Sequence, residues 1–212
     1  MPLVPIPVTD EQAKAVQKLA DFGTTVVGET GQLARYMGRV LGTTPEDVVG
    51  LVIGDPLHFV RTAAALKYDE WITRLHRNRG VTPEPVSPSL AIPLLRAAYD
   101  ESRPELQELW AQLIAAAMDP QRRNRVRRSF IDTVQRLDPL DVLVLKMLDT
   151  TGKPTPNVRD YLAAKLSVSS REIELSALNL SEVKCVGNIG MMATDNFIIT
   201  FYGSELVQVC SG

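Results

Sequence analysis

Helix-start signals follow one another between residues 102 and 148, and they limit the possible folds more than any other stretch of the chain. Ser102-Arg-Pro-Glu105 has the form of a capping box, in which the Ser hydroxyl accepts the Glu amide and the Glu side chain reaches back to the Ser amide. Asp138-Pro139 opens a later helix, because proline at the first helical position loses no hydrogen bond. The stretch predicts three consecutive helices.

Apolar residues recur at helical spacing within each of these helices and predict which side packs inward. In the first helix they are Leu106, Leu109, Trp110, Leu113, Ile114 and Ala117. In the second, which Ser129 and Asp132 open, they are Phe130, Ile131, Val134 and Leu137. The third helix, Leu140 to Leu148, is apolar on nearly every side, so we expect it to lie deepest in the core. These residues predict a helical core and assign no chemistry.

The order of residues in this stretch resembles a known protein family. The matching segments are Leu109–Asp119 (LWAQLIAAAMD), Ser129–Ile131 and Leu137–Asp141 (LDPLD), and Pro85–Leu95 and Thr200–Gly203 also fit. They resemble the Abi-alpha family, bacterial proteins grouped with abortive infection, the suicide response to phage. The resemblance covers about residues 40 to 210. It implies anti-phage defence and carries over no catalytic residue. One departure is Arg127-Arg128, which stands where the family pattern has His-Pro.

Proline and glycine divide the chain into three parts. Residues 1–8 carry three prolines and are predicted to form an extended N-terminal arm. Residues 9–149 are predicted to form the helical core domain. Asp149 to Asn157 is rich in Gly and Pro and marks a boundary, so residues 150–212 are predicted as a second, smaller domain.

The second domain has the element order of a winged helix. Val158 to Leu166 is a predicted helix, and Ser169-Ser-Arg-Glu172 is a capping box that opens another. Cys185 to Gly190 and Asn196 to Phe201 are short enough to be two strands. Helix, turn, helix and a two-stranded ribbon follow in that order. The predicted fold class is therefore mainly α, with a multi-helix bundle followed by a small winged-helix-like α+β domain.

A long amphipathic helix is predicted from Leu57 to Arg79, with Tyr68, Trp71, Ile72 and Leu75 inward. Gly80 to Ser89 is the clearest loop in the chain. Ser87 or Ser89 is predicted to cap the helix that follows.

Composition limits the class of protein. The chain has 212 residues, of which 45% are hydrophobic and 23% charged, as is ordinary for a soluble globular protein, and the net charge is only −2. No run approaches the roughly 20 apolar residues of a membrane-spanning helix. The N-terminus has no basic region of a signal peptide, and the two cysteines form no disulfide pattern. We expect a cytoplasmic protein.

Glycine is concentrated before residue 55. Two pairs, Gly38/Gly42 and Gly50/Gly54, have the spacing that lets helices approach closely. The favoured interpretation is a close-packed pair of core helices. The alternative is a segment that leaves the core and enters a membrane, but Asp55-Pro56 and nearby polar residues interrupt its apolar run.

No motif points to catalysis. His58 and His76 are too far apart on one helix to share a ligand, and neither has Cys or acid partners at metal-ligand spacing. Asp138 and Asp141 could be imagined as paired carboxylates, but their positions match the cap and third residue of a helix. We predict no catalytic residue, no metal and no cofactor.

The winged-helix interpretation raises the question of DNA binding. The polar residues of the presumed recognition helix are Arg171, Glu172, Glu174, Ser176 and Asn179. Its two carboxylates would face phosphates, whose neutralisation supplies most of the affinity for DNA. We therefore expect this domain to contact protein or only to pack.

Five arginines lie within seven residues of the connection between Asp119 and Ser129: Arg122, Arg123, Arg125, Arg127 and Arg128. The favoured interpretation is a solvated loop that pairs with acids of a neighbouring subunit. The alternative is a phosphate-binding patch for nucleotide, nucleic acid or anionic lipid.

The predicted function is a non-enzymatic anti-phage defence protein that acts by binding and conformational change. A protein partner or homo-oligomer is expected. The alternatives are a membrane-permeabilising suicide effector, acting through the glycine-rich segment, and a nucleic-acid or nucleotide-binding regulator that uses the arginine patch.

Overall fold

The computed structural model describes residues 38–40, 42, 58–151, 157–188 and 197–211. The chain divides into two compact units, residues 1–67 and 68–212, and the division falls within helix α3 (His58–Arg79). The first unit is described only as a helical turn at 38–40, Gly42 and the start of α3. The packing below is that of the second unit. The predicted limits at residues 8 and 149 stay predictions.

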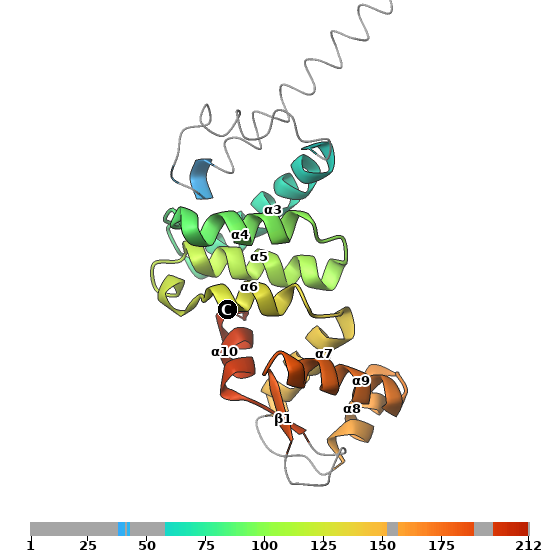
Figure 1. Ribbon diagram of the computed structural model, residues 1–212. Coiled ribbons are helices and arrows are strands. Elements are labelled where there is room, and N and C mark those ends of the chain that lie inside the picture. The colour runs from blue at the N-terminus through green and yellow to red at the C-terminus, as the bar shows by residue number, and fades with distance from the viewer. Residues whose placement is uncertain (1–37, 41, 43–57, 152–156, 189–196, 212) are drawn as a thin grey trace, which may run out of the picture. The chain divides into compact units, whose positions relative to one another are not determined.

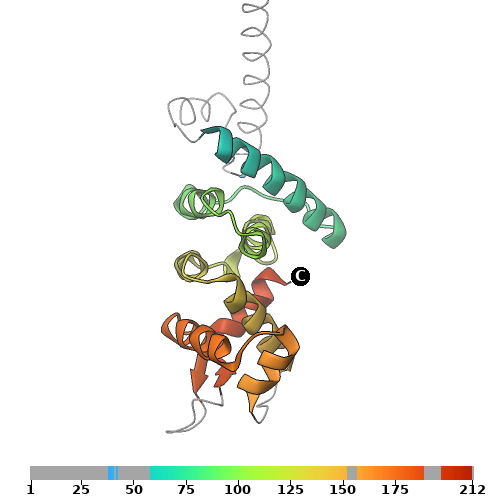
Figure 2. The same cartoon turned by 90° about the vertical axis from the view of Figure 1, so that its right-hand side faces the viewer.

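The first layers of the second unit are helices that pack pairwise. They are α4 (Pro88–Tyr99), α5 (Pro104–Met118) and α6 (Arg128–Val134), and a short 3-10 helix, η1 (Arg123–Arg125), joins α5 to α6. Figures 1 and 2 show α4, α5 and α6 side by side. Helix α3 contributes Tyr68, which is buried and whose hydroxyl donates to the Ala98 carbonyl of α4 at 2.9 Å.

The remaining elements surround α7 (Pro139–Thr151). Helices α8 (Val158–Leu166) and α9 (Ser170–Glu182) pack on α7 and on each other. Strands β1 (Val186–Asn188) and β2 (Phe197–Ile199) pair antiparallel, with Gly187 opposite Ile198. Helix α10 (Phe201–Cys210) returns to α5 and α7 (Figure 1). The described chain is thus mainly helical with a small two-stranded sheet, as predicted.

Helix α5, rather than α7, is the most deeply buried element. Every residue from Leu109 to Met118 except Gln112 is buried, because the helix has neighbours on several sides. In α7, Leu143 is 40% exposed, so the expectation that Leu140–Leu148 lies deepest was wrong. An apolar composition favours burial but does not decide which helix is surrounded.

Of the two capping boxes predicted at Ser169 and Ser102, one is confirmed and the other was wrong. The capping box at Ser169 is confirmed, since Ser169 accepts the Glu172 amide and its own amide donates to the Glu172 carboxylate. The box at Ser102 was wrong, because α5 begins at Pro104 after Arg103. There the Glu101 carboxylate accepts the amides of Ser102 and Arg103 at 2.9 and 2.8 Å and takes the place of the predicted cap.

Helix α10 had no counterpart in the sequence prediction, which extended the last strand to Phe201. The strand ends at Ile199 because the Thr200 hydroxyl accepts the Gly203 amide and caps the helix. The signal was present in Thr200, a favoured N-cap residue. The β-branched Val207 and Val209 obscured it, since such residues favour strands.

Candidate interaction sites

The arginine-rich connection is tied to its own chain. Arg123 bonds Glu84 at 2.5 Å, and Arg125 makes two hydrogen bonds to Glu205 of α10, at 2.7 and 3.0 Å. Arg122 donates to the Ser211 carbonyl at 3.0 Å, just after α10. The connection therefore joins the loop before α4 to the middle of the C-terminal helix and to the residue that follows it.

These contacts neutralise part of the positive charge of the arginine-rich connection. The hydrogen bonds from Arg125 hold the pKa of Glu205 below its ordinary value, and Arg127 lowers it further. The side chains of Arg127 and Arg128 are exposed, and neither guanidinium forms a hydrogen bond or ion pair within the described parts of the chain. The acids that pair with the run thus include residues of the same chain. Anion binding by Arg122, Arg123, Arg125, Arg127 and Arg128 stays a prediction.

Of the two glycine pairs, Gly38/Gly42 lies within the described residues. Gly38 is buried in a helical turn, and Gly42 has a φ of 68°, the left-handed region that favours glycine. Gly50 and Gly54 lie outside the described residues, so the membrane-segment hypothesis is not addressed. Of the helices in the described ranges, none has the length and apolar character needed to cross a membrane.

Asp138 and Asp141 occupy the position before the first residue of α7 and the third residue of α7, as predicted. The Asp138 amide donates to the Asp141 carboxylate at 2.8 Å, and the Asp138 side chain accepts from Arg103. Asp141 is 2% exposed and also accepts from Ser176 and Asn179 of α9. All of its bonds are structural, and they join α7 to α9.

Histidine and cysteine occupy structural positions. His76 is buried, with Nε2 2.9 Å from the Ala115 carbonyl oxygen. Cys185 and Cys210 are buried free thiols, and burial raises the pKa of each to about 12. Across the described ranges, no group of His, Cys, Asp and Glu could hold a metal ion.

The outer face of α9 differs from its prediction. Ser176 and Asn179 were expected among the polar residues offered to a partner, but both donate to Asp141 on the α7 side. Glu172 is engaged in the Ser169 cap. The helix instead exposes Leu175 and Leu178, which are 63% and 60% exposed. This apolar face is unlike the basic surface that DNA binding requires.

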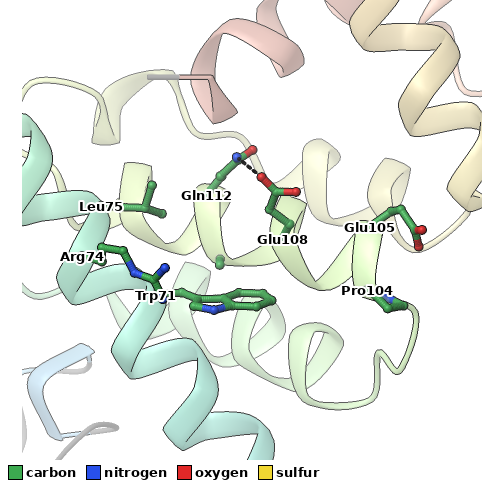
Figure 3. A pocket seen from close by; sticks show the side chains of 8 residues that line it. Trp71, Arg74, Leu75, Pro104, Glu105, Glu108 and Gln112 are labelled. Carbon is green, nitrogen blue, oxygen red and sulfur yellow. Dashed lines mark hydrogen bonds between the residues drawn. The ribbon is translucent and has the colours of Figure 1, made fainter.

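A hollow of about 470 Å³ lies between α3 and α5. We name it the α3–α5 crevice; its lining is Trp71, Arg74, Leu75, Pro104, Glu105, Glu108, Ala111 and Gln112. Figure 3 shows the Trp71 indole extending from α3 toward α5, with Glu105 and Glu108 on the opposite wall. The crevice is open and combines an apolar floor with the two carboxylates of α5. Arg74 of α3 also lines it, and Glu70 lies 3.7 Å from the Arg74 guanidinium.

Local packing fixes the parts of the crevice. The Trp71 ring meets the buried Tyr68 ring edge to face, with centroids 6.2 Å apart. On α5, Gln112 donates to Glu108 at 3.2 Å, one helical turn away. Glu105 and Glu108 are exposed, whereas Trp71 and Leu75 are half-buried. Sequence periodicity placed Trp71 and Leu75 on the inward face but gave no sign that α3 leaves α5 partly uncovered.

The comparisons with known proteins agree with the sequence resemblance. The family model described as abortive infection alpha matches residues 63–199, from within α3 to the end of β2. No curated protein and no solved structure matches the chain. The family match spans more than half of the 212 residues and contains the whole α3–α5 crevice and the arginine-rich connection. The chain belongs to the abortive infection alpha family.

Proposed function

We propose that this protein acts in anti-phage defence without catalysis, by binding a basic and partly apolar segment of a protein partner in the α3–α5 crevice. Family membership supports a role in abortive infection. The observation that carries the binding mode is the pairing of the Trp71 floor with the exposed carboxylates of Glu105 and Glu108. The partner's cations and apolar groups would meet these two features.

The composition of the crevice suits such a partner. Its volume of about 470 Å³ falls within the usual range of ligand sites, roughly 300–1,000 Å³. Tryptophan is enriched among the residues that dominate binding energy, and its ring attracts Lys and Arg. Two carboxylates one turn apart on α5 add electrostatic complementarity, which favours specificity and rapid association.

We propose that partner binding at the α3–α5 crevice loosens α10 through the arginine-rich connection. Helix α5 forms one wall of the crevice and leads directly into this connection. The Arg123–Glu84 and Arg125–Glu205 pairs are partly exposed, and exposed ion pairs contribute only about 0–1 kcal/mol each. A partner that shifts α5 would therefore break these two pairs at small energetic cost and loosen the attachment of the connection to α10, while the buried apolar face of α10 stays packed.

We interpret α7, α8, α9 and the β1–β2 hairpin as a winged-helix-like unit that contacts protein. The support is its element order and the exposed leucines of α9. Nucleic-acid binding is the second candidate, favoured by the exposed Arg127 and Arg128. It would rest mainly on these two cations, because the carboxylates of Asp119, Glu84 and Glu205 already pair with Arg122, Arg123 and Arg125.

Titration with a defined peptide tests the binding mode. The probe is a fluorescein-labelled helical peptide of about 14 residues with one leucine face and one lysine face, roughly four helical turns. Fluorescence anisotropy should detect binding to the parent. The Glu105→Lys/Glu108→Lys variant should bind about tenfold more weakly or worse, because cations would face cations.

The matched control is Asp132→Lys/Glu174→Lys, which makes the same change in net charge away from the crevice. It should bind like the parent. A lysine–serine peptide of equal charge should bind more weakly, since it lacks the apolar face. Equal binding by all three proteins, or no binding by the parent at low salt, would count against the crevice.

A further inference from the structure

Helix α9 has a partnered face and an unpartnered one. Its inner side buries Ile173 and Leu180 and packs against α7 and α8. On the outer side, four exposed residues follow one another at helical spacing: Arg171, Leu175, Leu178 and Glu182. They form one stripe along the helix, since residues three and four apart are surface neighbours. We name this the α9 stripe.

We propose that the α9 stripe pairs with the α9 stripe of a second copy of this chain, in an antiparallel two-fold dimer. The order of the residues is self-complementary. Leu175 and Leu178 have the same midpoint as Arg171 and Glu182, between Ser176 and Ala177. A two-fold axis at that point places Leu175 against Leu178 of the partner subunit. It places Arg171 against Glu182 of the partner subunit, twice by symmetry.

The charges select the antiparallel direction. In a parallel pair, the Arg171 residues would face each other at one end and the Glu182 residues at the other, and like charges repel. In the antiparallel pair both ends carry opposite charges.

Both charged residues of the α9 stripe can form an ion pair with the partner subunit. Arg171 makes no ion pair with a residue of the described chain. The Glu182 side chain is 70% exposed and accepts from Arg136 through Oε2, at 3.0 Å. Its Oε1 can accept from the partner subunit. Glu172 does not compete, because its carboxylate is engaged by Ser169.

The apolar centre supplies the driving force. Leu175 and Leu178 are each at least 60% exposed, and removing such side chains from water is favourable. The stripe is short, about 16 Å at 1.5 Å per residue, so it buries less than the roughly 1,200 Å² of a stable interface. The dimer is therefore weak and concentration-dependent, and cell crowding or a shared partner would populate it.

Two charge-reversed variants test this geometry by sedimentation velocity, from about 1 µM to about 200 µM, the range in which weak dimers form. The parent should dimerise toward the upper end. Arg171→Glu and Glu182→Arg should each stay monomeric, because each places like charges opposite one another. Mixed in equal amounts, the two variants should dimerise again, since every facing pair then has opposite charges. Non-specific association of exposed apolar side chains would not produce this rescue.

A second variant removes the apolar centre. Leu175→Ser/Leu178→Ser should abolish the dimer without unfolding the exposed helix face. Ile92→Ser removes another exposed apolar side chain, 53% exposed on α4, and should leave the dimer intact. The proposal is overturned if the parent is monomeric throughout, if the leucine variant still dimerises, or if mixing the two charge variants restores nothing. None of these outcomes bears on the α3–α5 crevice, so the two proposals are tested separately.

Discussion

Gly203 of α10 lies directly against the backbone of Cys185, so closely that a Cβ on Gly203 would overlap the Cys185 carbonyl oxygen. The same carbonyl accepts the Thr200 amide at 2.9 Å and the Thr200 hydroxyl at 3.1 Å. It therefore cannot move aside without breaking the cap of α10. This contact fixes the start of the last helix against the residue that precedes β1.

Gly203→Ala should lower the free energy of unfolding by about 1–3 kcal/mol, because the added methyl group meets backbone rather than a mobile side chain. Urea denaturation followed by circular dichroism measures the change. Gly187→Ala in β1 is the matched control, since its nearest atom would be a Thr200 methyl carbon at an ordinary 3.6 Å. A Gly203→Ala protein as stable as the parent would show that the two backbones are not in contact.

Asp141→Ala should be far more costly than Asp138→Ala. Loss of the buried Asp141 carboxylate leaves the Ser176 hydroxyl, the Asn179 amide and the Asp138 amide without their acceptor. Hydrogen bonds to a charged group contribute about 1.5–3 kcal/mol, so the loss should reach at least that range. The Asp138 side chain is exposed and, among the described residues, accepts only from Arg103, so its removal should cost less than about 1 kcal/mol. Similar unfolding midpoints for both variants would contradict the assigned role.

The two thiols should be inert in the folded protein. Burial raises the pKa of Cys185 and of Cys210 to about 12, so both stay protonated where an ordinary thiol, with a pKa near 9.0, ionises. Ellman's reagent at pH 8 should react slowly with the native chain and with two thiols once urea unfolds it. Because the folded pKa values are raised, stability should be constant below about pH 9 and fall as the pH rises toward 12. Rapid reaction of a native thiol would contradict this burial.

Removal of the arginine contacts should loosen α10 without unfolding the protein. Arg123→Ala/Arg125→Ala breaks the pairs to Glu84 and Glu205, each worth at most about 1 kcal/mol. Hydrogen–deuterium exchange of residues 201–210 should become faster, while α5 keeps its protection. Arg128→Ala is the control and should leave this exchange unchanged, because Arg128 is exposed and takes no part in the pairs to Glu84 and Glu205. If residues 201–210 exchanged at the same rate in both variants, the contacts of Arg123 and Arg125 would not be what holds α10 in place.

Much of the fold could be read from local signals. Periodicity and proline placed α3, α5, α6 and α7 close to their observed limits, because amphipathic spacing and helix starts are properties of single elements. The capping box at Ser169 and the two short strands were likewise encoded within a few residues. The family resemblance, carried by three short segments, was confirmed over residues 63–199.

The candidate sites depended on tertiary relationships that local patterns do not contain. Ser176 and Asn179 have polar side chains, and only the position of Asp141 explains why they point inward. Glu101 displaced Ser102 as the cap of α5 because Arg103 holds it in place. The crevice beside Trp71 arises from the way α3 meets α5, which neither helix specifies alone.

Survival of infected cultures tests the central claim most directly. A suicide response removes infected cells, so bacteria that express the parent protein should survive when phage are few and collapse when every cell is infected. With equal expression, Glu105→Lys/Glu108→Lys should give no protection, whereas Asp132→Lys/Glu174→Lys should protect like the parent. Full protection by the crevice variant would contradict the account, because defence would then not depend on a cationic partner bound between α3 and α5.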